Sequence, residues 1–161
     1  MRWNPEVTVA AVVEVDRRFL IVEERVAGRL VLNQPAGHVE DRESLIDSVV
    51  RETREETAWR FHPEALIGTY LWRDAVSERT YLRFAFCGRV DDHKPQQRLD
   101  TGILRTLWMS HDQLLAQPLR LRSPLVLRCM QDFLLGKRQP LDSVACLDLD
   151  TAIRFGSAVN L

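Results

Sequence analysis

The twenty residues from 37 to 56, GHVEDRESLIDSVVRETREE, constrain this chain more than any other segment. Residues three and four apart on an α-helix lie one above the other, so Glu52, Glu55 and Glu56 share one helix face. Like charges at this spacing destabilise a helix by about 0.2–0.5 kcal/mol per pair. A helix that keeps such carboxylates is expected to offset their repulsion with bound cations, and hard divalent ions prefer oxygen ligands. The segment therefore predicts a divalent-metal site.

Length and charge set the general class of the chain. Its 161 residues, 45% hydrophobic and 28% charged, are typical of one soluble globular domain, and we assign residues 1–161 to that domain. A net charge of −1 gives no reason to expect nucleic acid or a membrane as a partner. No apolar run approaches the roughly 18 residues that span a bilayer, and residues 1–15 do not read as an export signal. We expect a cytoplasmic protein, either a monomer or a homodimer.

The cysteines carry no signal for a site of their own. Cys87, Cys129 and Cys146 are odd in number, widely spaced and without a CxxC pair. A structural zinc site would need paired ligands that the sequence does not contain. We therefore expect buried, reduced thiols, as is usual in a cytosolic protein.

Two kinds of periodicity predict a mixed α/β architecture. Valine-rich or alternating segments predict strands at residues 7–15, 19–23, 66–72, 79–90 and 104–109. Residues 25–32 are expected to form a short excursion, 33–37 a loop before the first helix, and 91–100 a polar loop. The tail after about residue 137 is only weakly patterned. Strands interspersed with two or three helices indicate a mixed sheet.

Capping signals locate the helices. The first helix is expected to open at Glu43-Ser44, with an apolar stripe made of Leu45, Ile46, Val49 and Val50. Ser110 and Gln113 form the pattern of a capping box for a second helix that runs through Ala116. Residues 123–135 predict the last helix, with Pro124 at its first helical position and Gly136 as its stop.

The first helix and the loop before it resemble the Nudix box, G-x5-E-x7-R-E-U-x-E-E-x-G-U. The matching positions, which include every charged position of the box, are Gly37, Glu43, Arg51, Glu52, Glu55 and Glu56. At roughly one in fifteen per fixed position, such a coincidence arises about once in ten million starts. Two positions of the box, residues 37–59, depart from the pattern. Thr53 replaces an aliphatic residue and Ala58 replaces the second glycine, which puts the helix end in question.

The resemblance extends from about residue 7 to residue 133. The segments VTVAAVVEV, FLIVEE, LNQPAGHVE, YLRFAF and LRSPLV are similar to a NudJ-type phosphatase branch of this family. It implies an α/β/α sandwich with a mixed central sheet. It also implies an Mg²⁺-dependent hydrolase, with Mn²⁺ as a substitute, that cleaves a diphosphate linkage by attack of water at phosphorus.

Roles for the box residues follow from the same resemblance. It implies that Mg²⁺ is held by Glu52, Glu55, Glu56 and the backbone carbonyl of Ala36. Either Glu52 or Glu56 is the base that activates water, and the sequence leaves that choice open. Arg51 is implied to hold the catalytic glutamates through its planar guanidinium. Glu43 is implied to anchor the loop to the helix.

Substrate contacts are less well specified by the sequence. Arg83 lies among apolar residues of a predicted strand, so it needs an anionic partner, which the diphosphate or the acidic helix would supply. The Trp72 indole would stack on a base or a pyrimidine ring. Gly37 lets the backbone approach a ligand closely. Asn33 and Gln34 either face the ligand or are ordinary turn residues.

For four further residues we prefer an ordinary structural or surface role to a functional one. Asp100 is the nearest candidate for an additional acid, but a solvated loop aspartate is the simpler reading. Arg120 and Arg122, before the last helix, are taken as surface residues rather than a phosphate clamp. His38 is taken as a hydrogen-bonded structural residue.

The expected substrates are nucleoside tri- and diphosphates and thiamine-type compounds, namely thiamine diphosphate and hydroxymethylpyrimidine diphosphate. One alternative is a house-cleaning pyrophosphatase for oxidised or non-standard nucleotides. Another is a non-catalytic Nudix module that binds a ligand, although a binding module has no need for repelling carboxylates.

Overall fold

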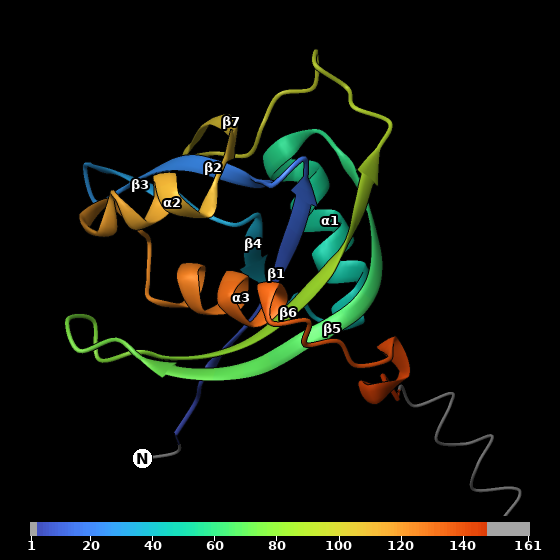
Figure 1. Ribbon diagram of the computed structural model, residues 1–161. Helices are drawn as coiled ribbons and strands as arrows, with labels where there is room; N and C mark the ends of the chain where they lie inside the picture. Colours follow the sequence, from blue (N-terminus) through green and yellow to red (C-terminus); the bar gives the residue numbers. More distant parts are fainter. Residues whose placement is uncertain (1–2, 148–161) are drawn as a thin grey trace, which may run out of the picture.

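The computed structural model describes residues 3–147 (Figure 1). The strands are β1 (Glu6–Val15), β2 (Arg18–Val26), β3 (Arg29–Asn33), β4 (Ala36–His38), β5 (Arg60–Arg73), β6 (Thr80–Asp91) and β7 (Ile103–Met109). The α-helices are α1 (Leu45–Thr57), α2 (His111–Leu115) and α3 (Leu125–Leu134), and two short 3₁₀ turns span Pro118–Arg120 and Leu141–Ser143. The predicted tail is described only to residue 147, and its remainder lies outside the described residues.

The strands form one mixed sheet in the order β3-β2-β1-β6-β5, with β4 paired to β1 and β7 paired to β2. β1 and β6 run parallel, from Glu6 opposite Tyr81 to Val13 opposite Gly88. All the other pairings are antiparallel. The predicted mixed sheet is therefore confirmed.

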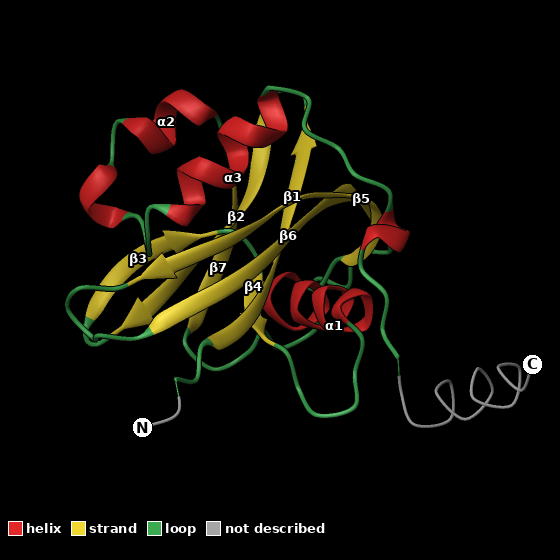
Figure 2. Ribbon diagram, turned by 90° about the horizontal axis from the view of Figure 1, so that it is seen from below, coloured by secondary structure: helices red, strands yellow, loops and turns green. Residues whose placement is uncertain are grey.

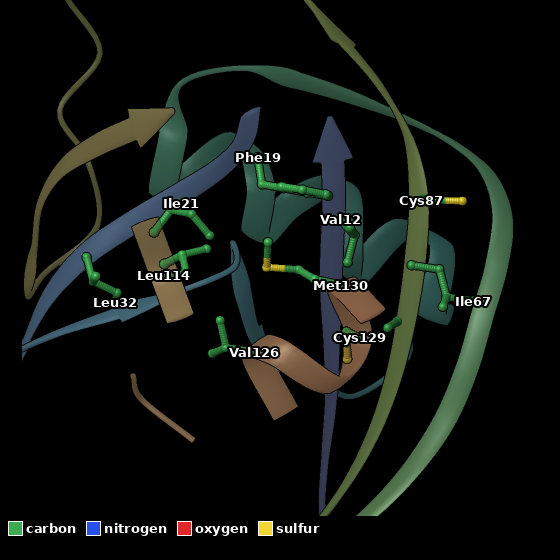
Figure 3. Close-up of a cluster of buried hydrophobic side chains, with 11 residues drawn as sticks. Val12, Phe19, Ile21, Leu32, Ile67, Cys87, Leu114, Val126, Cys129 and Met130 are labelled. Carbon is green, nitrogen blue, oxygen red and sulfur yellow. The ribbon is translucent and has the colours of Figure 1, made fainter. Parts of the chain in front are cut away.

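β1 packs against helices on both of its faces. Successive side chains of a strand point to opposite faces, and the valine-rich β1 is buried on both. Val9, Ala11 and Val13 pack in the cluster that also contains Val49 of α1. Val12 packs in the other cluster, beside Met130 of α3 (Figure 3). α1 accordingly lies on the opposite side of the strands from α2 and α3 (Figure 2).

The structure adds two strands that the sequence did not predict. Residues 29–33 pair with β2 as β3, because Ala27 (φ 47°) and Gly28 (φ 80°) form a tight two-residue turn with left-handed backbone. Ala36–His38 pair with β1 as β4, although this segment was expected to be loop. Both strands are short, and strand pairing across the sheet, rather than local pattern, decides them. β5 also begins six residues earlier than predicted, at Arg60.

The helix boundaries follow the predicted caps. The Ser44 hydroxyl accepts a hydrogen bond from the Asp47 N–H at the start of α1 (3.0 Å), and both capping-box bonds of α2 are present. Gly136, with φ 78°, follows the end of α3 as predicted. Among residues 3–147, no helix combines the length and apolar character that crossing a membrane requires.

Ala58 ends α1 in a left-handed conformation, with φ 61° and ψ 8°, where the family pattern has glycine. Its N–H donates to the Arg54 carbonyl (2.9 Å), so the helix closes as a glycine would close it. The alanine Cβ makes this conformation costly by about 1 kcal/mol. The helix therefore keeps its exit despite the substitution, at some cost in stability.

We predict that Ala58→Gly stabilises the protein, because relief of backbone strain exceeds the loss of one buried methyl group. The expected gain is up to about 1 kcal/mol, or about 2–4 °C in Tm. The matched control is Ala116→Gly, at the right-handed C-cap of α2 (φ −70°), where glycine should lower Tm instead. Thermal melts of the two variants check this, and equal shifts would contradict it.

Candidate functional site

Arg51 is the centre of a charged network that joins α1 to the loop before it. Its Nε and Nη2 donate to the two carboxylate oxygens of Glu43 (3.0 and 2.7 Å). Nη1 donates to Glu52 (2.9 Å) and Glu55 (3.1 Å), and Nη2 also reaches the His38 carbonyl (3.0 Å). The bidentate bond goes to Glu43 rather than to the glutamates predicted to be catalytic. Arg51 thus ties the loop and the helix together and orients two carboxylates at once.

Glu43 lies where the resemblance implied an anchor between loop and helix. One of its oxygens also accepts the Glu40 N–H (2.7 Å). Its hydrogen bonds to Arg51, opposed in part by burial, lower the pKa of Glu43 to about 2. Glu43 is therefore ionised throughout the neutral range.

The three helix carboxylates occupy two different environments. Glu52 and Glu56 are buried, with 8% and 7% exposure, and both line a cavity. Burial raises the pKa of Glu52 and raises that of Glu56 well above its usual value. Glu55 keeps a side chain that is 46% exposed, bonds to Arg51 and does not line the cavity. The shared helix face predicted from spacing therefore divides into two buried carboxylates and one at the margin.

β4 brings the backbone against these carboxylates. The Ala36 N–H donates to Glu56 (2.9 Å). The Pro35 carbonyl and the Val39 N–H form hydrogen bonds with β1. Because the peptide groups of successive residues in an antiparallel strand point in opposite directions, the N–H and the carbonyl of Ala36 point away from β1. A Cβ added to Gly37 would lie 2.1 Å from the carboxylate carbon of Glu52. Glycine is thus required at this position so that the Glu52 carboxylate can lie against the strand.

The cavity has a volume of about 340 Å³ and is open on one side. Its lining combines residues that the sequence singled out with others that it did not. It is formed by Thr8, Glu24, Asn33, Ala36, Gly37, His38, Glu40, Glu52, Glu56, Trp72, Tyr81, Arg83, Asp100, Thr101, Ile103, Arg122, Ser123 and Leu125. Acidic side chains outnumber basic ones in this lining, which suits a cavity that receives cations.

Several buried polar atoms of the cavity lining have no hydrogen-bond partner within residues 3–147. They are Arg83 Nε and Nη1, Thr8 Oγ1, Asn33 Oδ1 and Ser123 Oγ. Unpaired buried polar groups cost about 1–3 kcal/mol each, so native proteins rarely keep them without a reason. Their concentration around one cavity indicates a site that is completed by a bound molecule.

An aromatic pair borders the same cavity. Trp72 of β5 and Tyr81 of β6 are directly opposite in the strand register and stack with ring centroids 5.3 Å apart. Tyr81 was not predicted as a site residue. Its signal was available, because it lies two residues before Arg83 and therefore on the same face of β6.

Gln34 differs from the other proposed substrate residues. It is 1% exposed, does not line the cavity, and donates through Nε2 to the Val126 carbonyl of α3 (2.7 Å). This contact holds α3 to the sheet. Asn33, its neighbour, does line the cavity.

One further expectation is wrong and two are incomplete. Asp100 is an exposed loop residue, as expected, but it also lines the cavity, and its N–H donates to the Glu55 carbonyl (2.9 Å). Arg122 lines the cavity and pairs with Glu24 (3.5 Å), and Arg120 pairs with the buried Glu23. The sequence missed these roles because they depend on which loops meet. Cys146 is exposed, whereas Cys87 and Cys129 are buried as expected.

A hard metal ion requires several oxygen ligands that converge on one point. Among residues 3–147, no three His, Cys, Asp or Glu side chains are already arranged to hold one. Arg51 engages Glu52 and Glu55 in this arrangement. The carboxylates of Glu52 and Glu56 still supply the oxygen donors that a hard metal ion prefers. Both are largely removed from water, and among residues 3–147 the only cation that pairs with either of them is Arg51, which contacts Glu52.

Similarity to known proteins identifies the family. Residues 4–129 match the family model described as the NUDIX domain. The chain is 37% identical over 142 residues to the protein named Phosphatase NudJ of Escherichia coli (strain K12), and the match covers 88% of this chain and 92% of the relative. The Phosphatase NudJ of Shigella flexneri matches equally.

Solved structures agree. A NUDIX hydrolase from Nitrosomonas europaea has a TM-score of 0.89 and 48% identity, covering 91% of this chain and 99% of that one. A MutT NUDIX hydrolase from Burkholderia pseudomallei, at 18% identity and a TM-score of 0.64, covers 80% of this chain and 98% of its own and shares the fold. The chain therefore belongs to the Nudix family, with the Nudix fold that its box predicts, and is a hydrolase of phosphorus anhydrides.

Proposed function

We propose that this protein cleaves the diphosphate linkage of small organic diphosphates in a reaction that depends on Mg²⁺. The observation that carries the proposal is the pair of buried carboxylates, Glu52 and Glu56. Burial raises the pKa of both, because their oxygens are removed from water and the folded chain does not supply enough positive charge to offset this. A divalent ion and a phosphate group together would satisfy these carboxylates and the unpaired Arg83 on the cavity wall.

Glu52, Glu56, the nearby Glu55 and the Ala36 carbonyl are the proposed ligands of Mg²⁺, with Mn²⁺ as a substitute. Such an ion, when bound, neutralises phosphoryl charge and lowers the pKa of water. The chain's own residues do the rest. Glu52 or Glu56 receives the proton of the attacking water, and Arg51 holds the Glu52 and Glu55 carboxylates in position. Catalysis then consists mainly of positioning and electrostatic stabilisation.

The proposed substrates are nucleoside tri- and diphosphates and thiamine-type diphosphates, in keeping with the relatives named Phosphatase NudJ. The stacked Trp72 and Tyr81 offer a flat apolar surface for the organic ring of such a molecule. The proposed location is the cytoplasm, whose reducing conditions suit three cysteines without disulfides.

The first test measures phosphate release from thiamine diphosphate, hydroxymethylpyrimidine diphosphate and a panel of nucleotides, with Mg²⁺ and with a chelator. We expect turnover that the chelator abolishes. Glu56→Gln or Glu55→Gln should lower kcat by about 10³-fold or more with the fold intact, because each removes a charge proposed to hold the metal or to take the proton.

The control for these variants is Glu64→Gln, whose side chain is 60% exposed and lies on β5 away from the cavity. It should keep wild-type turnover. Tight ligand binding with no phosphate release from any diphosphate would contradict the proposal and favour a binding module. Near wild-type kcat in purified Glu56→Gln would also contradict it.

Gly37→Ala provides a second prediction, because the new methyl group would occupy the position of the Glu52 carboxylate. Since a carboxylate at the end of a flexible side chain can move aside, Tm should change little. The displaced carboxylate should raise the Mg²⁺ concentration needed for half-maximal turnover by about tenfold or more. Metal titrations and melts check this, with Gly28→Ala as the contrasting variant. Because Gly28 lies in a left-handed turn (φ 80°), alanine there should lower Tm and leave the metal dependence unchanged. A large loss of Tm with unchanged metal dependence would contradict it.

A third prediction concerns pH and the metal-free protein. Burial raises the pKa of Glu56, so the folded state favours its protonated form. Its stabilising contribution is present below the ordinary glutamate pKa and is lost as pH rises through the raised value. Glu56→Gln, which stays neutral, should therefore raise Tm in a chelator at neutral and higher pH, and the difference should vanish in acid.

Melts of wild type, Glu56→Gln and the surface variant Glu64→Gln across pH measure this effect. Mg²⁺ should raise the Tm of the wild type more than that of Glu56→Gln, because a ligand that binds only the folded state stabilises it. A pH-independent difference between wild type and Glu56→Gln would contradict the prediction.

A further inference from the structure

A second hollow, here called the groove, continues from the cavity and leads away from the carboxylates of α1. Its volume is about 910 Å³, against about 340 Å³ for the cavity. Four residues line both hollows, namely Trp72, Tyr81, Arg122 and Ser123. Because the two hollows are continuous, a molecule whose phosphates lie in the cavity would extend into the groove.

Three connections of the chain form the groove, and each contributes apolar side chains. They are the turn between β2 and β3, the turn between β5 and β6, and the segment 118–124 before α3. In Figure 1 the two turns lie on the same side of the molecule, at the left of the view. The apolar lining includes Val26, Val31, Val76, Leu121, Pro124 and Leu127. The groove therefore has mainly aliphatic walls.

Every charged side chain of the groove already has a partner within residues 3–147. The pairs are Arg29 Nη2 with the Leu119 carbonyl (3.0 Å), Asp74 with the Ser77 hydroxyl (2.6 Å), Arg79 with Glu6 (3.9 Å) and Arg122 with Glu24 (3.5 Å). Among the buried side-chain atoms left unpaired in the same part of the chain, only Ser123 Oγ lies on the groove, at its border with the cavity. The unpaired atoms of Thr8, Asn33 and Arg83 lie on the cavity alone.

This distribution of polar groups favours a ligand with two unlike ends. The cavity offers unpaired polar atoms and carboxylates to a metal ion and a diphosphate, whereas the groove side chains offer little to a polar group. A nucleobase in the groove would lose hydrogen bonds to water that these side chains do not replace. An aliphatic chain loses none, and its removal from water is favourable.

We propose that the groove binds an aliphatic chain, so that the enzyme also hydrolyses alkyl diphosphates, with the diphosphate in the cavity. This inference rests on the proposed function and adds a second substrate class to it. The oxygen of water bonds to one phosphorus while the bond from that phosphorus to the bridging oxygen breaks. The bridging oxygen keeps the electron pair, and the proton of water passes to Glu52 or Glu56. The products are an alkyl monophosphate and inorganic phosphate.

The first test measures binding of the methyl, butyl and octyl monoesters of methylenediphosphonic acid, in which carbon replaces the bridging oxygen. Calorimetric titration in Mg²⁺ should give the octyl ester a Kd about 100-fold below that of the methyl ester. Complete burial of one methylene group is worth about fourfold in affinity, and an open groove should give about twofold. Equal Kd values for the three esters, or octyl binding that a chelator does not weaken, would overturn the proposal.

Variants locate the chain in the groove. Leu127→Asn should reduce the advantage of the octyl over the methyl ester to about tenfold or less, with the methyl ester unaffected. Leu127 also packs against a hydrophobic cluster, so Val76→Asn, at a turn residue that is 94% exposed, provides a variant without a folding cost. It should reduce the advantage about twofold to threefold.

The matched control is Leu119→Asn, at a residue that is 83% exposed and lies outside the groove. It should keep the full advantage of the octyl ester. An advantage that neither Leu127→Asn nor Val76→Asn reduces, or that Leu119→Asn reduces equally, would show adhesion of the chain elsewhere and would overturn the proposal.

Turnover of methyl and octyl diphosphate separates this inference from the proposed function. With Mg²⁺, the octyl compound should have a KM about 100-fold lower and a similar kcat, because the chain binds equally in the ground and transition states. Phosphate release from both with equal KM values would overturn the inference and leave the proposed function standing. Binding that depends on chain length, without phosphate release from any diphosphate, would instead contradict the proposed function.

Discussion

The site depends on one guanidinium that is shared among several partners. Arg51 bonds to Glu43, Glu52, Glu55 and the His38 carbonyl, so the loop before α1 and the acidic face of the helix cannot move independently. Without that cation, carboxylates one helical turn apart would repel each other and turn outward to water. With it, Glu52 is drawn against β4, where Gly37 leaves the space that its carboxylate occupies. The geometry of the cavity follows from this contact.

The cavity combines charges that the folded chain does not neutralise. Glu56 lies at one side with its pKa well raised by burial, and Arg83 borders the cavity with a guanidinium whose Nε and Nη1 have no hydrogen-bond partner among residues 3–147. Each is unfavourable alone, and together they complement a metal ion next to a phosphate group. Binding sites commonly give up stability in this way, because groups held ready for a ligand are unsatisfied until it arrives. The unsatisfied groups border the cavity, and two separate hydrophobic clusters lie on either side of β1.

Much of this could be read from the sequence, because the relevant signals are local. The box spacing predicted the acidic helix, and the resemblance implied the Arg51 bridge, the Glu43 anchor and the Nudix fold. Arg83 was recognised as a charge in an apolar strand that lacked a partner. β3, β4 and the start of β5 were missed because the pairing partner decides whether such short or irregular segments become strands. The expected roles of Asp100 and Arg122 were incomplete because no sequence pattern reports which loops meet across a cavity.

What the sequence determined by itself is the chemistry of α1, since helical spacing fixes which side chains share a face whatever packs around them. It also determined the double burial of β1, which is evident from its run of valines and alanines. Only the tertiary structure decided which carboxylates are desolvated. Glu52 and Glu56 face β4 and the cavity, whereas Glu55 lies at the solvent edge, and that difference depends on the angle at which α1 packs against the sheet. It likewise assigned Gln34 to the interior and Tyr81 to the cavity, because burial depends on contacts between segments far apart in the chain.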